Sequence, residues 1–149
     1  MAKLITKYSH CFVCGDKNEC GLKIDFYFDE GKAKAEYIAS PYLQGYKDIL
    51  HGGIISTLLD EVMIKSILAL EIMVVTTSMD IKFKNPVKIG EKIWLEGWIK
   101  EEKGRIITAE GKAVKQNHTL VAEAEGTYFK VKDSMKKFLE KSLETKLNS

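Results

Sequence analysis

The sequence predicts an α+β domain in which one long helix is enclosed by an antiparallel β-sheet. Three observations support this fold class. Residues 52–70 are apolar around most of a helical circumference, which is typical of an enclosed helix. The segments on both sides alternate between apolar and polar residues, as half-buried strands do. Short turns rich in Gly, Asp and Asn join these segments, which favours hairpins and therefore antiparallel pairing.

Two strands are expected before the helix. Residues 22–28 alternate between apolar and polar side chains, and residues 32–38 return after the turn at residues 29–31, so the two form a hairpin. Residues 1–21, rich in Cys, Gly and Asn, are expected to be irregular, and residues 40–50 form a loop that leads into the helix.

Four strands and a second helix are expected after the central helix. The strands cover residues 74–84, 92–101, 105–116 and 120–132. Small residues recur on one face of the last two strands and would let the helix approach the sheet closely: Ala109, Gly111, Ala113, Ala122, Ala124 and Gly126. The C-terminal helix lies within residues 133–149. The expected order is β-β-α-β-β-β-β plus this helix, in one domain spanning residues 1–149.

Composition and charge exclude several classes of function. The 23 basic and 21 acidic residues are scattered, with no basic stripe of the kind that binds nucleic acid. The longest apolar segment is interrupted by Asp60, Glu61 and Lys65, so it is not expected to span a membrane. No signal peptide is recognisable, and three cysteines, an odd number, do not suggest a disulfide framework. We therefore expect a cytoplasmic protein without nucleic-acid or membrane partners.

Two glycines, Gly52 and Gly53, mark the start of the central helix. Glycine lets an acyl carbonyl approach the free backbone N–H groups of a helix start, which the helix dipole reinforces as donors to a developing oxyanion. A tight turn that needs glycine for its dihedral angles is the alternative, and the glycine pair taken alone favours it.

Asp60 is the candidate reactive group of the helix. One turn away in either direction, its face carries apolar and hydroxyl side chains and no cation, so burial of the carboxylate would be costly and indicates function. Glu61 differs because Lys65, four residues later, can pair with it on an exposed stripe. We therefore interpret Glu61 as a surface acid. A solvated helix face or a structural hydrogen bond remains the alternative for Asp60.

The spacing of these residues has a consequence for assembly. Gly52 and Asp60 are eight residues apart, which is about 12 Å along a helix. One carbonyl cannot contact both groups of the same helix. If the two act together, the site needs two antiparallel helices, as a twofold dimer provides.

At this point the chain resembles a known family. The central motif is a histidine, two glycines and an aspartate nine positions after the histidine: His51, Gly52, Gly53 and Asp60. A later strand ends in Phe-Lys-Asn-Pro-Val-Lys-Ile-Gly-Glu at residues 83–91, and Cys-Phe-Val-Cys-Gly at residues 11–15 looks like the opening of bacterial members. Over residues 11–131 the chain resembles the hotdog-fold acyl-CoA thioesterases of the thioesterase superfamily, of the phenylacetate-pathway (PaaI-like), human mitochondrial-associated and 4-hydroxybenzoyl-CoA thioesterase types.

The resemblance implies hydrolysis of acyl-CoA by a homodimer or a dimer of dimers (a homotetramer). Gly52 or Gly53 would donate its amide to the thioester carbonyl, and Asp60 of the facing subunit would act as general base or nucleophile. A hydroxyl on the following strand would hold the attacking water, with Thr76 as the best match and Thr77 beside it. No cofactor is implied, because the coenzyme A moiety is part of the substrate.

The resemblance also implies substrate-binding residues. His51 is expected to pack and hydrogen-bond at the loop-to-helix junction, and Gln44 lies near the place of a family amide residue. The segments that match the family's coenzyme A contacts contain one amide and three cations: Asn85, Lys88, Lys103 and Arg105. The cations suit phosphate groups, and solvated turn residues are the alternative for them.

The cysteines invite a zinc site, which we do not expect. Cys11 and Cys14 form one Cys-x-x-Cys pair, but no second pair follows, and His10 is too close in sequence to Cys11 to share one tetrahedron easily. Cys11, Cys14 and Cys20 are therefore expected to be reduced structural cysteines.

Two other functions compete with hydrolysis. A hotdog-fold acyl-CoA hydratase or dehydratase would pair His51 with Asp60 across the dimer, although the usual motif of such enzymes does not place two glycines after the histidine. A non-catalytic acyl-CoA-binding module is the third possibility, and the presence of Asp60 argues against it. The sequence does not identify the acyl group.

Overall fold

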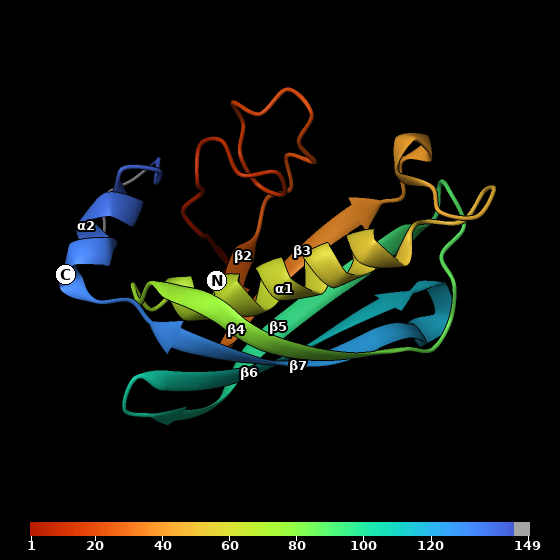
Figure 1. Ribbon diagram of the computed structural model, residues 1–149. Coiled ribbons are helices and arrows are strands. Elements are labelled where there is room, and N and C mark those ends of the chain that lie inside the picture. Colours follow the sequence, from red (N-terminus) through yellow and green to blue (C-terminus); the bar gives the residue numbers. More distant parts are fainter. Residues whose placement is uncertain (145–149) are drawn as a thin grey trace.

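In the computed structural model, which describes residues 1–144, a long helix lies lengthwise against a twisted seven-stranded antiparallel sheet (Figure 1). The helix is α1, Gly52–Leu68. The strands are β1 Lys3–Leu4, β2 Tyr27–Asp29, β3 Lys32–Ile38, β4 Val74–Phe83, β5 Lys92–Lys103, β6 Ile106–Lys115 and β7 Thr119–Lys130. Their order across the sheet is β1-β2-β3-β5-β6-β7-β4, so β4 forms one edge. The predicted fold class is confirmed.

Helix α1 is the centre of the core. Its residues Leu58, Leu59, Val62, Met63 and Ile67 are completely buried. Close packing against the sheet depends on small residues, as predicted, but the tightest approach is at a glycine of β5 that the prediction did not include. A Cβ atom on that residue, Gly97, would lie 2.5 Å from the Val62 carbonyl oxygen, so no larger side chain fits between helix and sheet.

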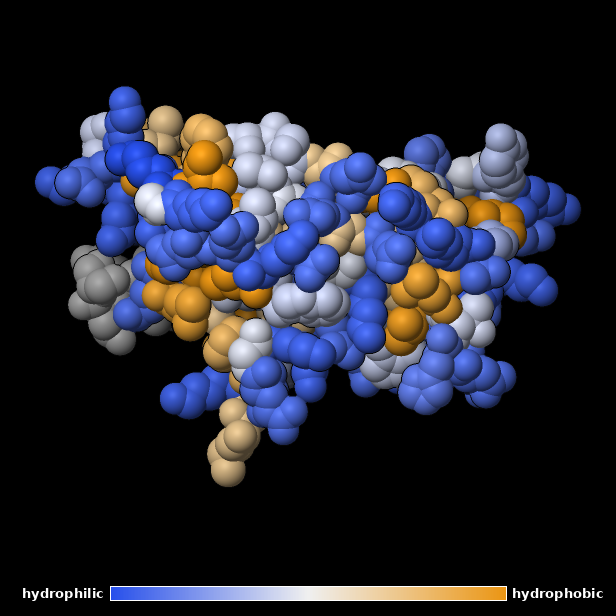
Figure 2. Space-filling model, turned by 90° about the horizontal axis from the view of Figure 1, so that it is seen from below, coloured by the Kyte–Doolittle hydropathy of each residue, from blue (hydrophilic) through white to orange (hydrophobic). Residues whose placement is uncertain are grey.

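The outer face of the sheet is charged. In register across three strands, Glu96 pairs with Lys112 and Lys112 pairs with Glu123. Seen from below, hydrophilic residues cover much of the molecule, with separate hydrophobic patches between them (Figure 2). The alternation that predicted the strands therefore separates a charged outer face from the helix-covered inner face.

The N-terminal part differs from the prediction. The strand expected over residues 22–28 is reduced to β2, because Leu22 and Ile24 instead donate backbone hydrogen bonds to the carbonyls of Phe12 and Val13. The segment expected to be irregular also contributes a strand, since β1 pairs with β2. This adds one strand to the predicted order.

The C-terminal helix is shorter than expected. Helix α2 spans Asp133–Glu140. The chain then turns so that the Ser9 amide donates to the Ser142 carbonyl at 2.8 Å and Tyr8 pairs with Leu143. The prediction over residues 145–149 lies outside the described residues. Two short 3₁₀ helices, Pro41–Leu43 and Gln116–His118, complete the structure, and within residues 1–144 no helix is long and apolar enough to cross a membrane.

Candidate active site

Asp60 accepts two hydroxyl hydrogen bonds on one carboxylate oxygen. The Thr76 hydroxyl of β4 and the Tyr128 hydroxyl of β7 each donate to Asp60 Oδ1 at 3.0 Å. Among the described residues no hydrogen bond reaches the second oxygen, Oδ2. Asp60 is half-buried and Tyr128 is completely buried. The sheet therefore holds the carboxylate by Oδ1, and Oδ2 stays available.

A β-bulge in the edge strand aims the two neighbouring threonines in different directions. The pairing of β4 with β7 shifts register between Thr76 and Ser78, which leaves Thr77 as the extra residue. The Thr77 hydroxyl donates to the Thr127 carbonyl at 2.9 Å, whereas Thr76 reaches the helix. Thr76 therefore lies beside Asp60 at the candidate site, and the Thr77 hydroxyl is bound within the sheet.

Tyr128 is a site residue that the sequence analysis missed. A Cβ atom on Gly126 would lie 2.7 Å from the Tyr128 hydroxyl, so the glycine provides the space in which the phenol ring lies. Burial, with the negative charge of Asp60, raises the pKa of Tyr128 above its ordinary value and keeps the hydroxyl a donor. A signal was available, because Tyr128 continues the alternation that places Ala122, Ala124 and Gly126 on the inner face.

The start of α1 is capped by a histidine. The Gly53 N–H donates to His51 Nδ1 at 2.8 Å, and the His51 carbonyl accepts from the Ile54 N–H at 2.9 Å. A Cβ atom on Gly53 would lie 3.0 Å from His51 Nδ1, and one on Gly45 would lie 3.3 Å from the ring. The two glycines therefore accommodate the imidazole. Within residues 1–144, the N–H of Gly52 has no hydrogen-bond acceptor.

Four of the predicted residues line one groove of about 710 Å³ at this helix start: Gln44, His51, Gly52 and Asn85. The aromatic side chains of Tyr46 and Phe83 share it. The Gln44 amide holds the preceding loop, donating to the Pro41 carbonyl and accepting from the Asp48 N–H. The Asn85 amide donates to the Leu120 carbonyl at 2.7 Å. Both amides therefore shape the groove.

The predicted phosphate-binding cations do not lie together. Lys88 pairs through its backbone with Ile49 and lies near the groove. Arg105 Nη2 donates to the Lys130 carbonyl at 2.9 Å, where β7 meets the beginning of β4, and the exposed Lys103 pairs with Glu101 at 3.3 Å. Lys103 and Arg105 thus lie at the end of the sheet away from their own Gly52.

The assignment of Glu61 to an exposed stripe is wrong. Glu61 is only 8% exposed and Lys65 is completely buried, with 4.0 Å between the carboxylate and the ammonium. Lys65 also donates to the Thr6 carbonyl at 2.6 Å. Burial raises the pKa of Glu61 to about 7. The N-terminal segment covers this face of α1, which the residue spacing within the helix does not reveal.

Comparison with solved structures shows the same fold in several thioesterases. The chain is 21% identical to a thioesterase superfamily protein of known structure (TM-score 0.76). The match covers 80% of this chain and 63% of the other, so this chain spans less than two thirds of that protein's length. It is 20% identical to the *E. coli* PaaI protein from the phenylacetic acid degradation operon (TM-score 0.70; 74% and 81% covered). It is 19% identical to a hypothetical thioesterase of *Streptococcus pneumoniae* with coenzyme A (TM-score 0.66; 68% and 82% covered).

At these identities the structural matches establish the fold alone, which is the hotdog fold that the sequence resemblance implies. Among curated protein sequences none matches the chain significantly. The family model of the thioesterase superfamily matches residues 47–122, which include the helix start, Asp60 and Thr76. This match spans just over half of the 149 residues, and the chain therefore belongs to the thioesterase superfamily.

Proposed function

We propose that this protein hydrolyses acyl-CoA thioesters to a free acid and coenzyme A. The observation that carries the proposal is the Asp60 carboxylate, which two hydroxyls hold by one oxygen while the other oxygen stays available. A fixed carboxylate of this kind suits a general base or a nucleophile. Both roles remain open for Asp60.

In the proposed reaction the N–H of Gly52 polarises the thioester carbonyl. Its neighbour Gly53 is already engaged with His51, so Gly52 supplies the free donor of the helix start. In the direct route water adds to the carbonyl carbon, and the C–S bond then breaks. In the covalent route the Asp60 carboxylate attacks the carbonyl carbon and the C–S bond breaks, which gives an acyl-Asp60 anhydride that water then hydrolyses. In both routes the departing thiolate of coenzyme A takes up a proton. Asp60 accepts the proton of the water in the direct route.

The proposed site is shared between two subunits. Gly52 and Asp60 lie on one straight helix, about 12 Å apart. An antiparallel helix of a second copy would bring its own Gly52 toward Asp60. The edge strand β4 carries Thr76 and has one side unpaired among residues 1–144, which suits pairing with a second β4. We propose a homodimer, and a dimer of dimers as the larger assembly.

Such a dimer also accounts for the separated cations. Asn85 and Lys88 lie at the Gly52 end of one subunit, and Lys103 and Arg105 lie at the opposite end. An antiparallel partner brings the two ends together, so the proposed coenzyme A site combines both pairs. The *Streptococcus pneumoniae* thioesterase, solved with coenzyme A, supports this class of ligand.

A parallel in spacing supports the proposed residues. Two further structures of that *Streptococcus pneumoniae* protein carry alanine in place of an aspartate and of a threonine, and these positions are 16 residues apart. Asp60 and Thr76 are also 16 residues apart. The 4-hydroxybenzoyl-CoA subtype, the absence of a catalytic cofactor and the cytoplasmic location stay predictions.

The alternative functions find less support. A hydratase or dehydratase would use His51 as an acid or base, yet His51 Nδ1 is occupied by the Gly53 N–H and its ring is held between glycines. A binding module would not need a carboxylate supported by two hydroxyls.

The test is thiol release from a panel of aromatic, short and medium acyl-CoA substrates, with hydration of a 2-enoyl-CoA measured in parallel. We expect thiol release by the unaltered protein, and we expect Asp60→Asn to lower kcat by at least about 100-fold while acyl-CoA still binds. Hydration without thiol release would replace hydrolysis by the hydratase function. Equal turnover by Asp60→Asn would remove Asp60 from the mechanism.

A further inference from the structure

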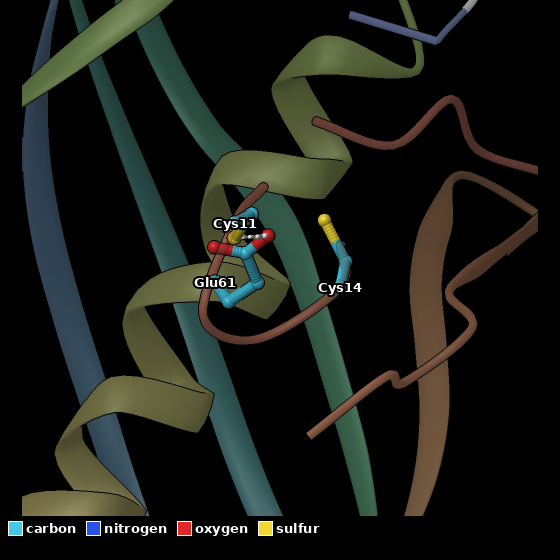
Figure 3. Close-up of side chains that lie close together, drawn as sticks. All are labelled: Cys11, Cys14 and Glu61. Carbon is cyan, nitrogen blue, oxygen red and sulfur yellow. Dashed lines mark hydrogen bonds between the residues drawn. The ribbon is translucent and has the colours of Figure 1, made fainter. Parts of the chain in front are cut away.

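A second group of reactive side chains lies on the other side of α1, outside the proposed active site. The sulfur atoms of Cys11 and Cys14 and a carboxylate oxygen of Glu61 all lie within 4.8 Å of one another (Figure 3). Cys14 is completely buried, Glu61 is 8% exposed, and Cys11 is half-buried. The proposed hydrolysis uses none of them. Thiols and a carboxylate gathered at a buried point are chemically a ligand set for a metal ion.

The backbone of the cysteine turn favours this use. The Val13 N–H donates to Cys11 Sγ at 3.3 Å, and the Gly15 N–H donates to the Cys11 carbonyl at 2.9 Å. A Cβ atom on Gly15 would lie 2.4 Å from the Cys11 nitrogen, so the turn closes only around glycine. Phe12 and Val13, the two residues between the cysteines, accept backbone hydrogen bonds from the amides of Leu22 and Ile24. The backbone of both cysteines is therefore held in place before any ligand binds, and Cys11 Sγ already accepts a hydrogen bond.

A metal ion binds cysteine as the thiolate, so Cys11 and Cys14 would both release their protons on binding.

With every ligand deprotonated, the charges of the group balance when a divalent cation is added. Two thiolates and the Glu61 carboxylate carry three negative charges, and the buried ammonium of Lys65, 4.0 Å from Glu61, supplies one positive charge. Unbalanced charge in a buried site is costly. A divalent ion brings the sum to zero with every ligand deprotonated.

Contrary to the expectation from the sequence, which lacks a second cysteine pair, we propose that Cys11, Cys14 and Glu61 bind a thiophilic divalent cation of the Zn²⁺ class, with water in the fourth position. Around a tetrahedral Zn²⁺, a sulfur and a carboxylate oxygen are about 3.6 Å apart, given bond lengths of about 2.3 and 2.1 Å. The distance from Cys11 Sγ to Glu61 Oε2 is 3.8 Å. Among residues 1–144 no further Cys, His, Asp or Glu joins the group, which leaves the fourth position to water. The ion would fasten the N-terminal segment to α1.

The test is titration of the reduced, metal-free full chain with Co²⁺, whose thiolate complexes absorb by charge transfer, followed by competition with Zn²⁺. Cys20→Ser serves as the matched control, because Cys20 is exposed and lies outside the group. We expect one equivalent of Co²⁺ to bind in the unaltered chain and in Cys20→Ser, and Zn²⁺ to displace it. At about a 100-fold excess over Kd, Zn²⁺ should raise Tm by about 8 °C.

Substitutions of the ligands distinguish this site from surface binding. We expect Cys11→Ser, at the half-buried position, to abolish the charge-transfer band. Glu61→Gln should keep the band and weaken binding at least about 10-fold, because both thiolates remain. Circular dichroism tests whether each variant is folded. If one of the two variants is unfolded, the other still tests the proposal. The proposal would be overturned if the unaltered chain took up no cobalt, or if Cys20→Ser lost its uptake. It would also be overturned if Cys11→Ser kept an unchanged spectrum and Glu61→Gln kept an unchanged affinity. These measurements do not depend on thioesterase activity.

Discussion

At the scale of single residues, the position of Asp60 depends on two hydroxyl donors that differ in origin. Thr76 reaches Asp60 from an exposed edge strand, and Tyr128 reaches it from a buried strand. Both bind the same oxygen, so the direction of the second oxygen is set by two bonds rather than by the helix alone. A small rotation of the carboxylate would displace that oxygen from the reacting atom, which makes the donors positioning residues.

We predict that Tyr128→Phe and Thr76→Val each lower kcat by about 10-fold, since one hydrogen bond to a charged group is worth about 1.5 kcal/mol. The control is Thr77→Val, which removes a hydroxyl bound to the Thr127 carbonyl instead of to Asp60. Steady-state kinetics with acyl-CoA gives the comparison. If Thr77→Val were as harmful as Thr76→Val, the effect would belong to the strand and not to Asp60.

We predict that Arg105→Ala raises KM for acyl-CoA several-fold and leaves kcat nearly unchanged. In the proposed site the phosphates lie far from the reacting carbonyl, so ground-state and transition-state binding weaken equally. The effect should shrink with added salt and with a short thioester that lacks the nucleotide. An unchanged KM at low salt would assign Arg105 to the turn alone, where it already binds the Lys130 carbonyl.

Asp60 and Glu61 show how far single residues can be interpreted from sequence. The spacing to Lys65 correctly predicts a carboxylate–ammonium pair. The same spacing says nothing about exposure, because the segment that buries Glu61 comes from residues about 50 positions away. Tyr128 was missed for a similar reason, since the distance between a tyrosine of the last strand and an aspartate of the helix depends on how closely the two elements pack.

At the scale of elements, the periodic segments were predictable and the irregular ones were not. Strand β3 has the predicted bounds, and α1 begins at the predicted residue and ends within two residues of the prediction. These elements are determined by their own apolar periodicity. The residues before β2 instead make backbone hydrogen bonds to the cysteine turn, a pairing with no local signal.

We predict that Gly97→Ala lowers the free energy of unfolding by about 2 kcal/mol. The added Cβ would lie 2.5 Å from the Val62 carbonyl oxygen and 2.8 Å from its carbon, so helix or strand must move. Gly52→Ala is the control, because its Cβ would meet only a Phe83 ring carbon at 3.7 Å. Chemical denaturation measures both. Equal stabilities would mean that α1 and the sheet separate more easily than their packing indicates.

At the scale of the whole molecule, the proposed shared site predicts complementation between inactive subunits. Gly52→Pro removes the proposed N–H donor yet suits a first helical position, and His51 before it is already extended, as proline requires. We predict that Gly52→Pro is nearly inactive, whereas Gly52→Ala, which keeps the N–H, is active. Mixing Gly52→Pro with Asp60→Asn should restore about a quarter of the activity, since half of the dimers are mixed and each has one intact site.

Subunit exchange is verified independently with tagged chains, and the mixture is assayed after exchange is complete. Recovery would show that Gly52 and Asp60 of different chains form one site. Verified exchange without recovery would contradict the shared site, and it would leave each subunit to work with its own residues.

The histidine cap of α1 also determines where the imidazole carries its proton. Because His51 Nδ1 accepts from the Gly53 N–H, the neutral ring must be the Nε2–H tautomer. Toward a ligand in the groove that His51 lines, the ring can therefore offer a hydrogen bond but cannot receive one.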